Sequence, residues 1–208
     1  MFRHIIWDFD GTIMDTYPCI IEGFLTALKQ EHVACSSEKI AQALRKSVKD
    51  TYEQIAEEFS ISEQFYPNYL AACANLEPLH ATLFAGIYDL CQSLCQRGVK
   101  QYIFTHRDHT STTHLLHLHG MDHMFQEIIS SDSGFARKPA PDAIYYLIHK
   151  YHMNPEEVLM IGDRELDLCA GYRAGVHTGF YGDPNNLTEI TPNFIWNCWS
   201  KAKNNLMP

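Results

Sequence analysis

The segment Ile5–Thr12 constrains the fold of this chain more than any other. Its sequence, IIWDFDGT, is a short apolar run that ends in two carboxylates, a glycine and a threonine. Side chains two residues apart on an extended backbone point the same way, so Asp8 and Asp10 can leave a strand end together. Gly11 allows a sharp turn, and the amides from Gly11 through Thr12 can line an anion-binding concavity. An Asp-Gly pair alone is also typical of an ordinary turn, so the prediction of an acidic site depends on partners elsewhere.

The composition favours a soluble globular protein with one main core. The 208 residues suffice for a sizeable core with a smaller companion domain, and 46% of them are hydrophobic. The formal net charge of −9 argues against a general nucleic-acid or anionic-membrane surface, although it allows a local cationic pocket. No apolar stretch reaches membrane length, and the N-terminal one ends too early for a signal peptide. We therefore expect a cytoplasmic protein without nucleic-acid or membrane partners.

Neither the cysteines nor the histidines form a convincing metal-binding motif. The seven cysteines are scattered and include no Cys-x-x-Cys pair, which favours reduced buried thiols over disulfides or a zinc knuckle. A histidine-rich run spans residues 106–123, but from His109 onward it is typical of a helix closed by Gly120. A catalytic zinc site would also need a carboxylate or thiolate at ligand spacing. We interpret these later histidines as structural.

The chain changes character along its length. From Thr16 to about His80 the apolar spacing predicts helices and no strand, with one helix starting near Pro18 and others over about 37–46, 51–59 and 67–75. Beyond that point helices alternate with short apolar strands at 100–105, 127–131, 158–161 and 176–181, and an edge strand is expected at 193–196. This alternation is typical of a mostly parallel sheet covered on both faces. We predict a doubly wound α/β core from residues 1–15 and 81–208, interrupted by an all-helical domain at 16–80.

Chemistry-bearing side chains follow four of the predicted strands. They are Asp8 and Asp10 after the first, Thr105 and His106 after the second, Lys138 after the third, and Asp163 with Asp167 after the fourth. Ligands of such sheets bind beyond the carboxyl ends of the strands, so we expect these residues to converge there. Alone, Thr105 is typical of a strand end and Lys138 of a solvated loop. Their combination indicates a functional site.

Together these motifs resemble those of the haloacid dehalogenase superfamily. The family's four ordered motifs are matched, across the whole core, by Asp8-x-Asp10-Gly-Thr, Thr105, Lys138-Pro and Gly-Asp163-x-x-x-Asp167. The helical segment after the first motif is similar to that of the phosphoglycolate phosphatase-like and β-phosphoglucomutase-like branch. The resemblance implies a Rossmann-like core with a helical cap. It also implies that the Asp8 side chain, the Asp10 backbone carbonyl and the Asp163 side chain bind Mg²⁺.

The residues themselves support an electrostatic argument for a cation. In a low-dielectric cleft, carboxylates repel a phosphate dianion by on the order of several kcal/mol, so a hard cation must intervene, and oxygen-only ligands suit Mg²⁺. With that charge neutralised, Asp8 can attack phosphorus and form an aspartyl-phosphate. Asp10 would protonate the leaving alkoxide and later take a proton from the hydrolytic water.

The remaining motif residues have supporting roles in this prediction. Thr105 would donate its hydroxyl to a phosphoryl oxygen, and Lys138 would supply a compact positive charge. The backbone amide at His106 would bind phosphate whatever the side chain is. Asp167 follows Asp163 by about one helical turn and so can face the same site in a supporting role.

The predicted function is a Mg²⁺-dependent phosphatase acting on a small phosphorylated metabolite, such as a phosphoglycolate-like acid or a sugar phosphate. A sugar-phosphate mutase shares the motif residues and stays open, as does a non-catalytic phosphate-binding regulator. A dehalogenase acting on haloacids would need neither Asp10 as an acid nor Mg²⁺. In the helical domain, Arg45, Lys46 and Lys49 could contact a substrate anion, but a charged solvent face is the favoured interpretation. A carbon–phosphorus hydrolase would need a lysine there, for which Lys46 and Lys49 are candidates only by location. The oligomeric state stays open, with a monomer expected.

Overall fold

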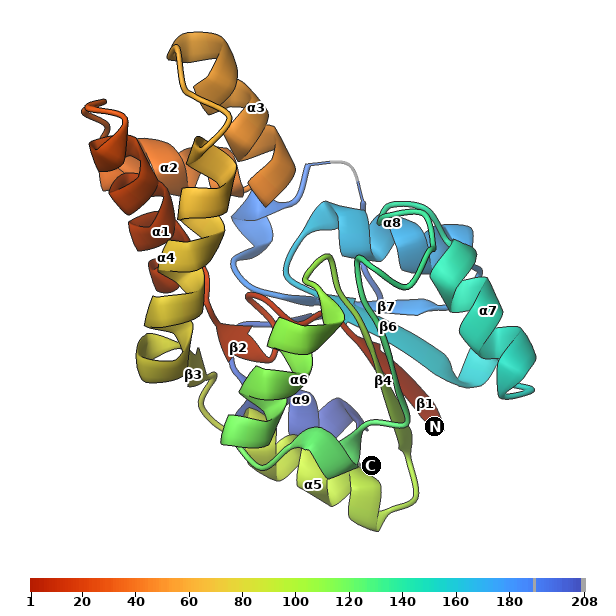
Figure 1. The fold of residues 1–208 in the computed structure, drawn as a ribbon. Coiled ribbons are helices and arrows are strands. Elements are labelled where there is room, and N and C mark those ends of the chain that lie inside the picture. Colours follow the sequence, from red (N-terminus) through yellow and green to blue (C-terminus); the bar gives the residue numbers. More distant parts are fainter. Residues whose placement is uncertain (189, 207–208) are drawn as a thin grey trace. The chain divides into compact units, whose positions relative to one another are not determined.

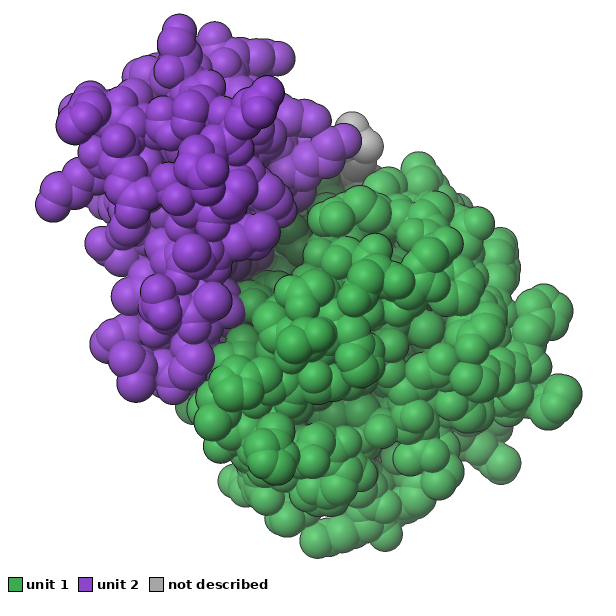
Figure 2. All heavy atoms as spheres, in the orientation of Figure 1, with its two compact units in different colours: residues 1–14, 83–208 green, residues 15–82 purple. Residues whose placement is uncertain are grey.

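The computed structural model describes residues 1–188 and 190–206 and divides into two compact units (Figure 2). Unit 1 consists of Met1–Met14 and Leu83–Pro208, and unit 2 of Asp15–Thr82. The chain passes between the units at β2 (Met14–Asp15) and β3 (Thr82–Leu83). These two short strands pair with each other, so both crossings belong to one small sheet.

Unit 1 is built on a six-stranded sheet with the order β5-β4-β1-β6-β7-β8 (Figure 1). The strands are β1 (His4–Trp7), β4 (Lys100–Phe104), β5 (Glu127–Ile129), β6 (Val158–Gly162), β7 (His177–Tyr181) and β8 (Phe194–Trp196). Every neighbouring pair is parallel, which confirms the predicted α/β sheet. From β1 the order runs to β4 and β5 on one side and to β6, β7 and β8 on the other. Such a switch point is where α/β sheets bind ligands.

Helices cover both faces of this sheet (Figure 1). They are α5 (Ile87–Gln96), α6 (His109–Leu118), α7 (Asp142–Lys150), α8 (Glu165–Arg173) and α9 (Trp199–Leu206). Side chains alternate along a strand, so Ile6 of β1 packs into the cluster that contains Ile144 of α7 and Ala170 of α8. The next residue, Trp7, instead contacts Trp199 of α9, with ring centroids 5.4 Å apart. Burial on both faces explains why these strands are short continuous apolar runs.

Unit 2 contains the helices α1 (Tyr17–Gln30), α2 (Ser37–Leu44), α3 (Val48–Glu58) and α4 (Phe65–His80). Its core includes Phe24 of α1 against Tyr69 and Phe65 of α4, with ring centroids 4.4 and 6.1 Å away. The helix predicted from residue 51 begins earlier, because Ser47 Oγ accepts a hydrogen bond from Asp50 N at 3.0 Å and caps α3. In the described residues of both units, no helix has the length and apolar character needed to cross a bilayer.

Candidate active site

The first motif forms a tight turn directly after β1. Asp8 N donates to Ile161 O at 2.8 Å, which extends the pairing of β1 with β6 by one residue. Gly11 has a φ of +81°, a left-handed conformation that residues with a Cβ rarely adopt. The turn closes where Phe9 O accepts from Met14 N at 3.0 Å. This geometry holds the Asp8 side chain at the sheet edge, where it is only 1% exposed.

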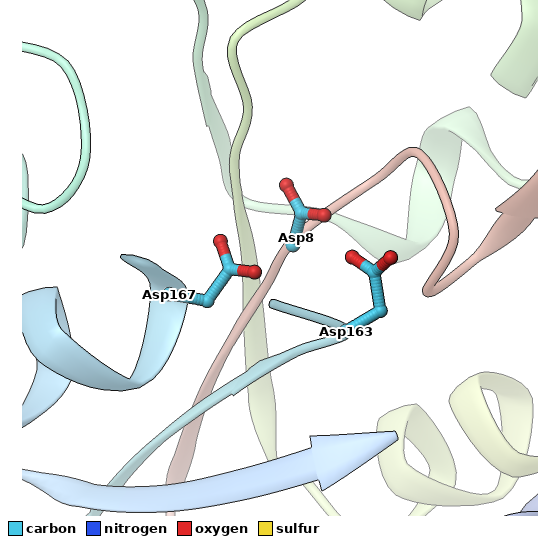
Figure 3. A group of neighbouring side chains, drawn as sticks. All are labelled: Asp8, Asp163 and Asp167. Atoms are coloured by element: carbon cyan, nitrogen blue, oxygen red, sulfur yellow. The ribbon is translucent and has the colours of Figure 1, made fainter. Parts of the chain in front are cut away.

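Three carboxylates converge at this edge (Figure 3). Asp8 follows β1, Asp163 follows β6, and Asp167 lies in the first turn of α8; each offers an oxygen within 4.8 Å of the others. Gly162 permits this approach, because a Cβ there would lie 2.3 Å from the Asp167 side chain. Asp167 also accepts from Arg164 N at 3.0 Å and so helps to cap α8. The structure therefore brings together three of the predicted acidic residues.

Lys138 lies against this carboxylate cluster and is almost completely buried. Its Nζ lies 2.5 Å from Asp8 Oδ1 and 2.6 Å from Asp167 Oδ1. It also donates to Phe104 O at the end of β4, at 2.8 Å. The contacts with Asp8 Oδ1 and Phe104 O are hydrogen bonds, whereas the contact with Asp167 Oδ1 is an ion pair. Lys138 therefore ties two of the carboxylates to the neighbouring strand.

The cluster carries more negative than positive charge. Burial raises the pKa of Asp8, and Asp167 raises it further, while Lys138 and Arg164 oppose the shift. Burial alone would lower the pKa of Lys138, but Asp167 and Asp8 outweigh it and raise that pKa, so the lysine stays charged. Asp8 Oδ2 is buried and has no hydrogen-bond partner among the described residues. An all-oxygen donor set with a surplus of carboxylates fits a hard divalent cation such as Mg²⁺.

Thr105 and His106 follow β4, beside the end of β1. Thr105 is buried, and its Oγ1 accepts from Arg107 N at 3.1 Å, so its own proton can be donated to another acceptor. Both ring nitrogens of His106 are buried and have no hydrogen-bond partner within residues 1–188 and 190–206. Burial lowers the pKa of His106 to about 2, assisted by the charges of Lys138 and Arg137. The imidazole is therefore neutral.

The side chain of Asp10 pairs with Arg107, an ion pair that the sequence analysis did not predict. Arg107 Nη2 lies 2.7 Å from Asp10 Oδ1, and the two side chains are 10% and 18% exposed. The carboxylate group that could hold a metal ion comprises Asp8, Asp163 and Asp167 and does not include the Asp10 side chain. The one sequence signal for Arg107 is its position two residues after Thr105.

The basic residues singled out in the helical segment lie on the surface of unit 2. Arg45, Lys46 and Lys49 are exposed. Lys49 Nζ lies 3.5 Å from Glu53 Oε1, one helical turn further along α3. This arrangement fits the charged solvent face that the sequence favours.

Comparison with known proteins identifies the family of the chain. The model of the haloacid dehalogenase-like hydrolases matches residues 5–180. A pyrophosphatase PpaX from Oceanobacillus iheyensis is 27% identical, over 93% of this chain and 91% of its own length. A phosphoglycolate phosphatase from Haemophilus influenzae is 26% identical, over 94% of both chains. The crystal structure of a predicted phosphoglycolate phosphatase from Haemophilus somnus has the same fold, with a TM-score of 0.84, 20% identity, and coverage of 98% of this chain and 97% of that one. The chain belongs to the haloacid dehalogenase-like hydrolases.

Proposed function

We propose that this hydrolase is a Mg²⁺-dependent phosphatase that acts on a small phosphomonoester through a phosphorylated Asp8. The observation that carries this proposal is the buried contact of Asp8 with Lys138 inside a group of three carboxylates. A carboxylate fixed by a lysine, in a site that also fits a hard cation, is suited to attack on an electron-poor phosphorus. The names of the relatives, a pyrophosphatase and a phosphoglycolate phosphatase, support phosphoryl chemistry.

The side chains of Asp8 and Asp163 and the backbone carbonyl of Asp10 would hold the metal ion. Asp167 has a supporting role, because one of its oxygens lies against Lys138 and the other accepts from Arg164 N. When bound, Mg²⁺ supplies positive charge between the carboxylates and a phosphoryl oxygen. The buried and unpartnered Oδ2 of Asp8 supports this assignment.

The reaction takes place in two steps at Asp8. First, an oxygen of the Asp8 carboxylate forms a bond to phosphorus while the bond from phosphorus to the leaving oxygen breaks, and Asp10, which enters this step protonated, gives that oxygen its proton. In the second step, water attacks the phosphorus of the acyl phosphate and Asp10 takes a proton from it. Inorganic phosphate leaves, and the Asp8 carboxylate is restored.

The other motif residues bind the phosphoryl group in this proposal. Thr105 donates its hydroxyl, and the backbone amide of His106 provides a second donor. Lys138 supplies a buried positive charge, held by hydrogen bonds to Asp8 Oδ1 and Phe104 O and by an ion pair with Asp167.

Unit 2 is assigned the role of a helical cap that selects small substrates and excludes water from the first step. This assignment is supported by its place in the chain, between the motif that carries Asp8 and all the others. The substrate classes to test first are a phosphoglycolate-like acid and sugar phosphates. Pyrophosphate joins them because of the pyrophosphatase relative.

A phosphate-release screen over these substrates, with Mg²⁺ and with a chelator, tests the proposal. We expect turnover to need Mg²⁺ and to fall roughly 10³-fold or more in Asp8→Asn, because the nucleophile is lost. Asp163→Asn should raise the Mg²⁺ concentration needed for half-maximal activity. Asp142→Asn, which removes an exposed carboxylate from the first turn of α7, is the matched control and should behave like the wild type.

Two outcomes would contradict the proposal. The first is equal turnover of the best substrate without metal or in Asp8→Asn. The second is a sugar phosphate whose phosphate changes position without net release, which would identify a mutase.

A further inference from the structure

The Arg107–Asp10 pair restrains the side chain that is assigned the acid–base work. Arg107 Nη2 donates to Asp10 Oδ1 at 2.7 Å, and Nε donates to Oδ1 at 3.1 Å and to Oδ2 at 3.3 Å. Solvated surface pairs hold their partners loosely, but these two side chains are largely buried. Two N–H groups of a planar guanidinium also define the direction of a carboxylate, which a single contact does not. Arg107 thus limits how the Asp10 carboxylate can rotate.

Arg107 is itself anchored at several points. Its backbone N–H donates to Thr105 Oγ1 at 3.1 Å, and its carbonyl accepts from Ser131 N at 2.9 Å. The guanidinium carbon lies 5.9 Å from the centre of the Phe9 ring, and Nη1 donates to Ser111 Oγ at 3.5 Å. The side chain therefore extends from a fixed backbone between the phosphate-binding Thr105 and the turn that carries Asp10.

We propose that Arg107 is a positioning residue that holds the Asp10 carboxyl group in the orientation needed for proton transfer to the leaving oxygen. This inference rests on the acid–base role proposed above for Asp10. Proton transfer requires hydrogen-bond geometry, and a misplacement of about 1 Å can cost about 100-fold in rate. A lysine in place of Arg107 keeps the charge but not the planar pair of donors, so it does not replace this function.

Two substrates with different leaving groups separate this role from a structural one. An alkoxide needs a proton to leave, whereas p-nitrophenolate leaves without one, and kcat/KM reports only the steps up to that departure. In Arg107→Lys and Arg107→Gln we expect kcat/KM to fall roughly 10- to 100-fold for the best alkyl phosphate, but less than about 3-fold for p-nitrophenyl phosphate. When Asp10→Asn is already present, either change should add less than about 2-fold, because both act on the same step.

Arg3→Gln is the matched control, since it removes an exposed arginine–carboxylate pair in which Arg3 Nε lies 3.1 Å from Glu157 Oε1. This variant should have wild-type kinetics with both substrates. Equal losses with the two substrates, full additivity with Asp10→Asn, or wild-type activity in Arg107→Lys would each overturn the inference. So would a rise in KM alone, which would make Arg107 a substrate-binding residue.

The failure of this inference is distinguishable from failure of the proposed function. If the wild type releases no phosphate from any tested substrate in the presence of Mg²⁺, the proposed function is wrong. The positioning role of Arg107 is then wrong too, and no Arg107 variant is needed to show it. An active wild type that responds to Asp10→Asn but not to the Arg107 variants overturns the positioning role alone. Thermal unfolding of each variant, measured in parallel, shows whether lost activity reflects lost structure.

Discussion

The two units differ in how they bury ionisable side chains, which form a cluster in unit 1. In unit 1, Asp8, Lys138 and Asp167 are at most 3% exposed, although all three are ionisable. In unit 2, Glu77 is also buried, at 5% exposed, but the core cluster consists of hydrophobic side chains, including aromatic rings such as Phe24 and Phe65. Burying apolar area stabilises a fold, whereas burying charge costs free energy unless every charge is paired. In unit 1, the charged groups that the proposed chemistry needs are therefore buried at a cost in folding free energy. In unit 2, the buried side chains of the core cluster mainly stabilise the fold.

Lys138→Met should produce the largest effect, because it leaves Asp8 and Asp167 buried without their cation. We expect the free energy of unfolding, measured with a chelator at neutral pH, to fall by about 3–5 kcal/mol. The loss should shrink as the pH falls. Burial and Asp167 already raise the pKa of Asp8, and removing Lys138 raises it further, so the folded state takes up a proton more readily than the unfolded one. Phosphatase activity should fall roughly 10²- to 10³-fold.

Lys150→Met is the matched control for this experiment. Lys150 Nζ lies 2.8 Å from Glu127 Oε2, but its side chain is 44% exposed. Glu127 keeps hydrogen bonds from the hydroxyls of Tyr146 and Tyr151 when Lys150 is replaced, so we expect a loss below about 1 kcal/mol and normal activity. Similar losses of unfolding free energy in Lys138→Met and Lys150→Met would show that burial does not make the Lys138 contacts more important for stability. The contrast between the two units would then be wrong.

Phe24→Ala tests the other side of the comparison. Phe24 is fully buried and contacts Tyr69 and Phe65, so the cavity should lower the free energy of unfolding of unit 2 by about 3–4 kcal/mol. The Mg²⁺ concentration for half-maximal activity should change less than about 2-fold, because the proposed ligands lie in unit 1. Urea unfolding and metal titration of the same sample measure both quantities.

Leu79→Ala is the control, since Leu79 is 78% exposed and its truncation leaves no buried cavity. Its unfolding midpoint should stay close to that of the wild type. If Phe24→Ala changed the metal requirement as much as Asp163→Asn does, the separation of stability from chemistry would be wrong.

Sequence patterns can place acidic side chains at one edge of the sheet, because parallel topology fixes where the strands end. Once β1, β4 and β6 are recognised as parallel neighbours, Asp8, Thr105 and Asp163 must follow at the same edge of the sheet. The Arg107–Asp10 contact joins residues 97 positions apart and depends on how two side chains turn. Spacing along the chain carries no such information.

A second miss concerns where a helix begins. The sequence pattern places the start of this helix at Thr51, a suitable N-cap residue, whereas Ser47 caps it in the structure. The structure places Thr51 inside α3, fully buried, with its hydroxyl donating to Ser47 O at 2.8 Å. Serine is a somewhat better N-cap than threonine, so the observed cap agrees with the local preference.

His106→Gln should change the free energy of unfolding less than Lys138→Met and Phe24→Ala do. It tests whether His106 stays neutral in the folded protein. The folded pKa of His106 is about 2 and its ordinary value is 6.5, so between pH 7 and pH 5 the unfolded chain takes up a proton that the folded chain refuses. His106 therefore favours folding fully above pH 6.5, and this contribution is lost by up to about 2 kcal/mol as the pH falls to 5. In His106→Gln the free energy of unfolding should decline less over this range, as measured by urea unfolding at several pH values. If the free energy of unfolding changed with pH in the same way in both proteins, His106 would take up its proton equally well in the folded and unfolded states. The carboxylates of unit 1 would then offset the burial of His106 and the charges of Lys138 and Arg137.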